Sequence, residues 1–371
     1  MSEWKEYKLG EIVVLNYGKA LAENKRISGN VPVYSSAEIT GWHNEPLVNS
    51  KGLIIGRKGT IGKVYYSNTP FFCIDTAYYI LPNEKIYDLK FLFYKLKTVG
   101  FEDLNEDSAV PGLNRETAYN QKVLLPPLPE QKAIASILSS LDDKIDLLHR
   151  QNATLEKMAE TLFRQWFVER RPEPDEGEAK EEWESRPLSS IANFLNGLAC
   201  QKFPPKNDIE KLPVLKIKEL NSGISENSDW ATTEVNPEYI VKNGDVIFAW
   251  SASLMVKIWD GQDCILNQHL FKVTSEYYPK WFYYLWCKYH LDEFIVKAAS
   301  HATTMGHIKR SDLDEAMVLI PSDKELEEMT LEVEPLINKI ISNNKQIKLL
   351  INLRDILLPK LMSGEITVNQ G

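Results

Sequence analysis

The stretch Pro126-Pro127-Leu128-Pro129-Glu130-Gln131 opens a segment that continues to Phe167, and a similar segment continues from Pro321 to Leu361. Residues that recur at the same spacing are Pro126, Glu130, Leu141, Lys144, Ile145, Gln151, Leu155 and Leu162, which correspond to Pro321, Glu325, Leu336, Lys339, Ile340, Gln346, Leu350 and Leu357. Ahead of each segment lies a longer, more divergent block. The residues shared by the two blocks are Trp4, Leu9 and Ile12 in the first, which recur as Trp183, Leu188 and Ile191 in the second. The repetition predicts two variable globular blocks, each followed by a similar long segment.

Apolar residues in both segments alternate at spacings of four and three, which is the pattern of a coiled-coil helix. In the first segment they are Ile134, Leu138, Leu141, Ile145, Leu148, Leu155, Ala159, Leu162 and Trp166, with Asn152 as the polar exception. In the second they are Met329, Val333, Leu336, Ile340, Ile347, Leu350, Leu357 and Leu361, with Asn343 and Arg354 as the polar exceptions. The pattern predicts two long helices packed on each other, with two helices packed only on their own blocks as the alternative. Pro335 further predicts a late start or a kink in the second helix.

An antiparallel coiled coil is the arrangement that we expect for these helices. Because each block precedes its helix, antiparallel packing would relate the two blocks by an approximate twofold axis. A parallel pair would place both blocks at one end of the rod. The expected fold is therefore a pseudo-twofold internal repeat of two globular blocks and two helices.

Length and composition limit the classes of protein to which the chain can belong. The chain has 371 residues, of which 43% are hydrophobic and 26% are charged, as in a globular protein of two domains. The sequence contains no run of about 18 apolar residues, and it begins without the pattern of a signal peptide. Its four cysteines, Cys73, Cys200, Cys264 and Cys287, show no framework spacing. These observations predict a cytoplasmic protein with reduced thiols.

The chain has a net charge of −9, and the location of the acidic residues decides what this charge implies. The residues from Glu173 to Glu184 are mostly acidic and follow the Pro-rich stretch that begins at Arg171, which predicts an exposed linker between the halves. The remainder of the chain is close to neutral. Charge alone therefore neither supports nor excludes DNA binding, and acidic residues elsewhere could also meet a partner subunit.

Both globular blocks show the same order of short strands, turns and aromatic helices. Residues 53–66 predict a hairpin with a glycine-rich turn, and residues 246–254 occupy the equivalent place in the second block. Cys73-Ile74-Asp75 parallels Cys264-Ile265-Leu266, and aromatic helical stretches follow at 91–94 and 281–284. The blocks are therefore expected to share one mixed α/β (α+β) fold that was duplicated and then diverged.

Four motifs carry a resemblance to a known family. Residues 127–145, followed after a helical stretch by Leu162-Phe163-Arg164-Gln165-Trp166-Phe167, resemble the conserved region of specificity subunits from Type I restriction–modification systems. Pro32-Val33-Tyr34-Ser35-Ser36, residues 56–62 and residues 267–271 are similar to motifs of the same family. The resemblance covers nearly the whole chain. The second helical region departs from the family pattern, because its entry reads Pro321-Ser322-Asp323-Lys324-Glu325-Leu326.

The resemblance implies a subunit that recognises DNA and has no catalytic activity of its own. It implies target recognition domains at 1–125 and 183–320, helical regions at 126–168 and 321–371, and an acidic linker at 169–182. Each target recognition domain would read half of a bipartite DNA sequence, and the helices would set the spacer. Two methyltransferase subunits carrying S-adenosylmethionine would modify adenine N6, and two restriction subunits using ATP and Mg²⁺ could join them. This chain itself would bind no cofactor.

The motifs of the chain give little support to an enzymatic function. A DNA adenine methyltransferase needs a glycine-rich cofactor loop, and the nearest match to its target-base motif, Asn68-Thr69-Pro70-Phe71, reads as a turn. The chain has no Walker A sequence. Cys287, His290, His301 and His307 could be drawn as a zinc site but lack a paired-cysteine motif, so we expect no metal. A coiled-coil adaptor without DNA affinity is a further alternative, but it leaves the divergence of the blocks unexplained.

Candidate DNA-binding residues are polar or basic side chains on predicted turns, because such groups pair with base edges in the major groove. They are Ser35, Ser36, Arg57, Lys58, Thr60, Lys63, Asn114 and Arg115 in the first block, and Lys216, Lys218, Ser251, Ser253, Asn267, Gln268, His307, Lys309 and Arg310 in the second. For each of them a structural turn or a solvated surface is an open alternative, and residues 267–269 could equally support the core. Candidate partner-binding residues on exposed helix faces are Glu130, Gln131, Lys132, Arg164, Gln165 and Trp166.

Overall fold

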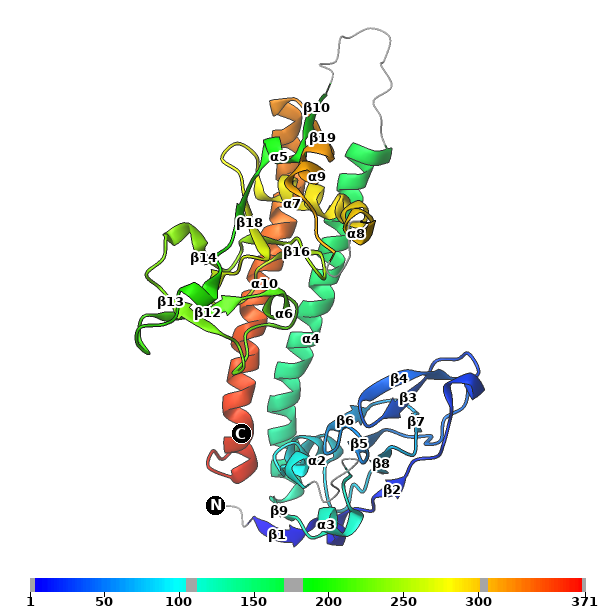
Figure 1. Cartoon of the computed structure of the whole chain (residues 1–371). Helices are drawn as coiled ribbons and strands as arrows, with labels where there is room; N and C mark the ends of the chain where they lie inside the picture. Colours follow the sequence, from blue (N-terminus) through cyan, green and yellow to red (C-terminus); the bar gives the residue numbers. More distant parts are fainter. Residues whose placement is uncertain (1–3, 105–111, 170–182, 301–305, 369–371) are drawn as a thin grey trace. The chain divides into compact units, whose positions relative to one another are not determined.

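The computed structural model describes residues 4–104, 112–169, 183–300 and 306–368 (Figure 1). It divides into two compact units. The first unit comprises the chain up to Asp146 together with the stretch from Leu349 onward, and the second comprises Leu147–Lys348. Each long helix therefore contributes to both units. The linear division into blocks and helical regions differs from these units, and the expected acidic linker lies outside the described residues except for Glu169.

The first unit contains three small sheets. Strand β1 (Lys5–Lys8) pairs antiparallel with β9 (Lys122–Leu125). A four-stranded sheet has the order β2 (Asn16–Tyr17), β8 (Ala77–Ile80), β5 (Gly52–Gly56) and β6 (Val64–Ser67). A three-stranded sheet has the order β4 (Glu38–His43), β3 (Val31–Ser35) and β7 (Phe72–Cys73), with β3 and β7 parallel. The short helices are α1 (Leu9–Ile12), α2 (Leu89–Leu96), α3 (Arg115–Tyr119), η1 (Glu23–Lys25) and η2 (Phe101–Asp103).

The second unit repeats this topology. Strand β10 (Glu184–Pro187) pairs with β19 (Met317–Ile320). One sheet has the order β11 (Asn193–Asn196), β18 (Leu270–Thr274), β15 (Val246–Ala249) and β16 (Met255–Ile258). The other has the order β13 (Trp230–Thr232), β12 (Lys211–Leu215), β17 (Cys264–Leu266) and β14 (Ile240–Val241). The short helices are α5 (Leu188–Ile191), α6 (Ile217–Ser222), α7 (Lys280–Tyr289), α8 (Leu291–Ser300), α9 (Arg310–Glu315), η4 (Cys200–Lys202) and η5 (Pro237–Tyr239).

Corresponding strands confirm that one fold occurs twice. The order β2-β8-β5-β6 in the first unit matches β11-β18-β15-β16 in the second, and the parallel pair β3–β7 matches β12–β17. The two predicted hairpins are β5–β6 and β15–β16, both antiparallel. Both aromatic stretches are helical, in α2 and α7. The mixed α/β duplication predicted from the sequence is therefore confirmed.

The described residues include two long helices, each of which has one part in either unit. Helix α4 (Leu128–Arg164) has 37 residues and ends in the π-helical turn η3 (Gln165–Glu169), and helix α10 (Asp323–Ser363) has 41 residues. Helix α10 begins well before Pro335 and continues past it, so the predicted late start is wrong. The proline occupies a helix interior, where its missing N–H removes one backbone hydrogen bond without ending the helix.

The two helices are antiparallel within each unit. In the first unit Arg354 Nη1 lies 3.0 Å from Asp142 Oδ1, and Leu361 joins the cluster that contains Ile134. In the second unit Asn343 Nδ2 donates to Asn152 Oδ1 at 2.8 Å. Rising residue numbers on α4 thus meet falling numbers on α10, as an antiparallel pair requires. The predicted antiparallel packing is confirmed.

The helices also complete the core of each unit. In the first unit Phe91 and Leu92 of α2 are fully buried with Leu138 of α4 and with Leu361 and Met362 of α10. The cluster of the second unit joins Phe163 of α4 and Val333 of α10 to Trp281, Phe282 and Phe248. Burial of large apolar and aromatic side chains is the main favourable term in folding. The helices therefore pack both on each other and on their globular units.

None of the helices in the described parts of the chain combines the length and the apolar character needed to cross a membrane.

Candidate nucleic-acid interface

A corresponding corner in each unit gathers several of the candidate DNA-binding residues. In the first unit, the chain beyond the end of β5 forms an isolated bridge between Lys58 and Gly112, just before α3. In the second unit, the chain beyond the end of β15 forms an isolated bridge between Ser251 and His307, just before α9. We call these places the first corner and the second corner. They are built alike, but their side chains differ.

The first corner is a pocket of about 310 Å³ whose lining includes Arg57, Lys58, Asn114 and Arg115. The structure thus brings together four candidates that are far apart in the sequence. The backbone of Arg57 is fixed on both sides, because its N–H donates to Thr76 O at 2.9 Å and its carbonyl accepts from Leu113 N at 2.8 Å. A rigid backbone restricts where the guanidinium of Arg57 can reach.

Two tyrosines that the sequence did not single out also line the first corner. The ring of Tyr17 lies 5.1 Å from Tyr78, and Tyr78 Oη donates to Leu113 O at 3.1 Å. Burial raises the pKa of Tyr78 to about 12, so its hydroxyl stays protonated and holds the segment before α3. Asn114 has a structural role as well, since its Oδ1 caps α3 by accepting from Glu116 N at 2.8 Å.

The remaining candidates of the first unit do not line the pocket of the first corner. Ser35 supports a turn, because its Oγ contacts Glu38 O at 3.2 Å and accepts from Ala37 N at 3.1 Å. Ser36 is buried, and Thr60 is exposed on the turn between Gly59 and Gly62, both of which have positive φ. Lys63 pairs with Glu102 at 2.9 Å and lines a different pocket. These four residues do not form one site.

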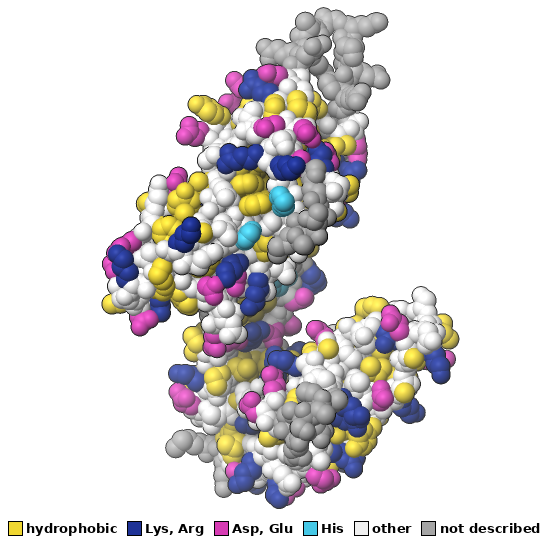
Figure 2. All heavy atoms as spheres, in the orientation of Figure 1, with side chains coloured by type: hydrophobic (Ala, Val, Ile, Leu, Met, Phe, Trp, Pro, Cys, Tyr) yellow, Lys and Arg dark blue, Asp and Glu magenta, His cyan; other side chains and the backbone are white. Residues whose placement is uncertain are grey.

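The second corner is aromatic. Trp250 stacks on Phe271 with ring centres 5.6 Å apart, and its Nε1 donates to Asn196 Oδ1 at 3.2 Å. His307 lies edge-on to Trp250 at 6.3 Å. Ser251 is buried and its Oγ lies 3.2 Å from His269 Nδ1, whereas Ser253 is exposed. Figure 2 shows histidine, lysine and arginine side chains close together on one face of this unit.

A neighbouring pocket of about 330 Å³ brings together Lys216, Lys218, Asn267 and Gln268. Asn267 is buried and its Oδ1 accepts from His269 N at 3.3 Å, so this residue supports the turn between β17 and β18. Lys216 pairs with Asp229. His269 also lines the pocket, with its Nε2 3.4 Å from Gln268 Nε2. Among the sequence candidates here, Lys218 and Gln268 have side chains that reach the pocket without an ion pair to a described residue.

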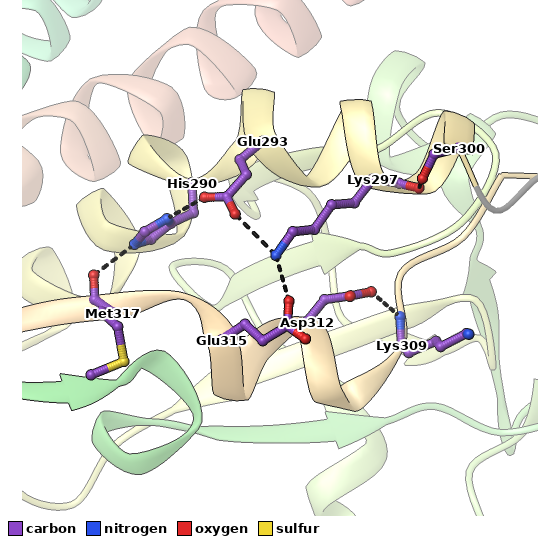
Figure 3. A network of polar contacts seen from close by, with 8 residues as sticks. All are labelled: His290, Glu293, Lys297, Ser300, Lys309, Asp312, Glu315 and Met317. Atoms are coloured by element: carbon purple, nitrogen blue, oxygen red, sulfur yellow. Dashed lines mark hydrogen bonds and ion pairs between the residues drawn. The ribbon is translucent and has the colours of Figure 1, made fainter.

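A polar network links α8 to α9 and includes Lys309, the residue before α9 (Figure 3). Lys297 of α8 contacts Glu293 at 3.0 Å and Glu315 of α9 at 2.8 Å. Hydrogen bonds to Glu315 and Glu293 raise the pKa of Lys297, which keeps this link charged. Asp312 Oδ2 accepts from Lys309 N at 2.6 Å. Lys309 Nζ points away from the network in Figure 3, and the Lys309 residue is exposed.

The same network includes His290, one of the residues of the alternative zinc site. His290 Nε2 lies 3.0 Å from Met317 O and its Nδ1 lies 3.3 Å from Glu293 Oε2, so both ring nitrogens face protein acceptors. Cys287 is fully buried, and burial raises the pKa of its thiol. His301 lies outside the described residues. Within the described parts of the chain, no group of three or more His, Cys, Asp or Glu side chains could hold a metal ion.

Two of the six candidate partner-binding residues are not exposed, so that expectation was wrong for Glu130 and Gln131. Glu130 is buried and its Oε1 accepts from Trp4 Nε1 at 3.3 Å. Gln131 is 1% exposed, accepts from Asp88 N at 2.9 Å and donates to Pro126 O at 2.9 Å. Both residues fasten α4 to the first unit. In the second unit Trp183 Nε1 makes the corresponding bond to Glu325, at 2.9 Å.

The other four candidate partner-binding residues are at least partly exposed. Lys132, Arg164 and Gln165 are exposed. Trp166 is half-buried, with its ring 6.3 Å from that of Trp281, so the end of α4 packs on the second unit. Partner binding by these residues remains a prediction.

Comparison with known proteins identifies the family. Residues 1–157 and 180–353 each match the model of the Type I restriction modification DNA specificity domain. The chain belongs to this family. It is therefore a DNA-specificity protein of Type I restriction–modification systems, and catalysis in such systems lies in other subunits.

Relatives in other organisms agree with this membership. The chain is 28% identical to the Type I restriction enzyme MjaIX specificity subunit of Methanocaldococcus jannaschii, over 86% of this chain and 78% of that protein. It is 21% identical to the HindI specificity subunit of Haemophilus influenzae, over 99% of this chain and 100% of that protein. A crystal structure of a Type I S subunit from M. genitalium has the same fold, with a TM-score of 0.66, 15% identity and coverage of 100% of this chain and 97% of that one.

Proposed function

We propose that each unit reads one half of a bipartite DNA sequence and that the two long helices set the spacer between the halves. Two methyltransferase subunits carrying S-adenosylmethionine would bind the helices and methylate adenine N6 within the sequence. Two restriction subunits using ATP and Mg²⁺ could join this assembly. The chain itself would hold no cofactor and would act in the cytoplasm.

This proposal rests on one observation, namely that the two units share a fold but differ in the side chains at their corresponding corners. The two units share strand order, but the first corner presents arginine and lysine where the second presents tryptophan and histidine. To recognise two different half-sites, the two units need the same fold but different side chains at the DNA. Lysine and arginine at the corners would also contact phosphates, which position the protein on the duplex without specifying sequence.

The contact residues that we propose are the candidates that the structure leaves accessible. They are Arg57, Lys58, Thr60, Lys63 and Arg115 in the first unit, and Lys218, Ser253, Gln268, His307, Lys309 and Arg310 in the second. Lys216 would contribute once released from Asp229. The buried or turn-forming residues Ser35, Ser36, Asn114, Ser251 and Asn267 would act by shaping the corners, with any base contact limited to their exposed edges.

Helix α10 offers an apolar surface that supports methyltransferase docking. Leu349, Leu353 and Ile356 follow the spacing of one helix face and are 69%, 45% and 58% exposed. Exposed leucines in a row are unfavourable in water and are typical of protein interfaces. Lys132, Arg164, Gln165 and Trp166 of α4 and η3 would add polar and aromatic contacts.

The decisive experiment is single-molecule sequencing of N6-methyladenine in cells with and without this chain. We expect one bipartite motif to disappear when the chain is deleted and to return with the wild-type gene. Retention of every motif in the deletion strain would contradict the proposal.

A domain exchange tests whether each unit reads its own half of the DNA sequence. Residues 16–119 would be replaced by those of another family member, and β1, β9 and both long helices would be kept so that their packing survives. Lys95 would be retained, because its Nζ donates to Met362 O at 2.8 Å. We expect one half of the methylated motif to change and the other to stay the same. A change in both halves would contradict modular reading.

A further inference from the structure

Tyr17 holds two arginines at the first corner. The Cζ atoms of Arg57 and Arg115 both lie 5.1 Å from the centre of its ring. Tyr17 is 47% exposed, so the cluster lies at the surface. A guanidinium over an aromatic face is attracted by the ring quadrupole. The ring therefore orients two cationic groups that would otherwise repel each other.

Arg57 retains donor capacity at this place. Its Nε is buried and finds no hydrogen-bond partner among the residues that the structure describes. Neither Arg57 nor Arg115 forms an ion pair with any described carboxylate, although Glu116 also lines the pocket. A buried donor without a partner is costly in a folded protein unless a ligand or water satisfies it. Because Arg57 Nε is buried, an acceptor from outside the chain would bond the terminal nitrogens of the guanidinium.

The second corner lacks this arrangement. Arg57 directly follows Gly56, which pairs with Ala77, and the corresponding Trp250 follows Ala249, which pairs with Leu270. Arg310 begins α9 as Arg115 begins α3, but its Nη2 donates to the backbone carbonyl of Phe194 at 3.3 Å. Among the described residues, the paired guanidinium cluster therefore belongs to the first unit.

We propose that Arg57, oriented by Tyr17 and flanked by Arg115, reads a guanine in the half-site of the first unit. The proposal rests on the function proposed above and adds the identity of one base. Guanine presents two neighbouring acceptors, N7 and O6, in the major groove, and the planar fork of arginine bonds both at once. Tyr17 is a positioning residue, because it fixes the fork before DNA arrives and so reduces the entropy lost on binding.

The test compares wild-type and Arg57→Lys chains, each co-purified with the methyltransferase of the same genome. Each complex selects from duplexes randomised across the first half-site, and bound DNA is sequenced. Lysine keeps the charge but loses the planar fork. We expect the preference for guanine at one position to fall on the order of tenfold or more, while the other positions keep their preferences. An unchanged preference at every position would show that Arg57 contacts phosphate only, which overturns the proposal.

Three further variants separate a loss of base reading from a loss of folding. Arg26→Lys is the matched control, because Arg26 lies in the same unit but donates to Thr40 O away from the first corner, and it should leave every preference unchanged. Tyr17→Leu removes the ring and should weaken the same guanine preference, whereas Tyr17→Phe should retain it. A Tyr17→Leu protein with the wild-type preference overturns the positioning role. If the wild-type complex selects no bipartite sequence, the proposed function fails; if it does and the Arg57 variant selects the same one, only this inference fails.

Discussion

Asn343 Nδ2 donates to Asn152 Oδ1 at 2.8 Å across the pair of long helices, and Asn343 is 1% exposed. Asn152 Nδ2 in turn donates to Asn344 Oδ1 at 2.6 Å. A polar pair inside an apolar seam fixes the register of two helices at some cost in stability.

Changing Asn343 to Ala should therefore lower the free energy of unfolding by about 1–2 kcal/mol, because Asn152 Oδ1 loses its donor at a partly buried place although Asn152 Nδ2 keeps its bond to Asn344. The double variant Asn152→Leu, Asn343→Leu should recover most of this loss. Urea unfolding of the three proteins measures both effects. Equal destabilisation of the single and the double variants would show that the pair does not act as a unit.

Gln131 should matter for the stability of the first unit. It forms hydrogen bonds with Asp88 N, Ile86 O and Pro126 O, of which the bond to Pro126 is buried and the other two are partly buried. Gln131→Ala should cost about 2–3 kcal/mol, since it leaves buried backbone groups without partners. The neighbouring exposed Lys132→Ala should stay within about 0.5 kcal/mol of the wild type. Denaturant unfolding of this matched pair checks the prediction, and similar stabilities would contradict it.

Lys288 links α7 to α4 through Glu156, at 2.6 Å, and Glu160. Burial alone would lower the pKa of its ammonium, and the two hydrogen bonds raise it above the ordinary value of 10.5. Lys288→Met should cost about 1–2 kcal/mol at pH 7, less than a fully buried pair because the carboxylates are partly exposed.

The pH dependence of this loss follows from the direction of the shift. A raised folded-state pKa gives stability that is complete below pH 10.5 and is lost as the pH rises through the folded-state value. The difference between wild type and Lys288→Met should thus stay constant from pH 7 to about 10 and shrink above it. The exposed Lys242→Met serves as the control. A difference that already shrinks between pH 7 and 9 would contradict the assignment.

The spacer should respond to the length of the helices. Helix α4 passes from one unit to the other between Asp146 and Leu147, and α10 does so between Lys348 and Leu349. One heptad inserted at both points keeps the apolar seam and lengthens each helix by about 10 Å, or roughly three base pairs. Methylome sequencing should show the same half-sites with a spacer longer by about three base pairs.

A heptad inserted in α4 alone is the control for this experiment. It shifts one seam against the other and should abolish methylation through mispairing. Altered half-sites with an unchanged spacer in the double insertion would rule out the ruler.

The sequence predicted those parts of the fold that depend on periodicity and repetition. Seam residues such as Ile134 and Val333 are fully buried as their spacing indicated. The repeated Trp4 and Trp183 were noticed as sequence matches, and the structure explains them by the bonds to Glu130 and Glu325. The late start that Pro335 predicted for the second helix was wrong, because packing along a long helix outweighs one missing backbone hydrogen bond.

The candidate site was harder to predict. Arg57 and Arg115 are separated by a long stretch of sequence, and only the fold brings them onto one tyrosine. Tyr17 carried no signal of its own except that it is an aromatic residue beside Gly18. Glu130 and Gln131 looked like exposed polar residues at a helix start, because burial of a polar side chain depends on partners such as Trp4 and Asp88 that lie elsewhere in the sequence.

Leu361 and Met362 lie in the core of the first unit, whereas the second unit is built from the uninterrupted stretch Leu147–Lys348. The core residues of the second unit therefore become available as one continuous stretch of chain. The first unit, although it emerges from the ribosome first, must wait for residues close to the C-terminus before its core can close. The unit whose synthesis begins first is thus the one whose core is completed last, and its half-finished form exposes apolar surface for as long as the rest of the chain is being made.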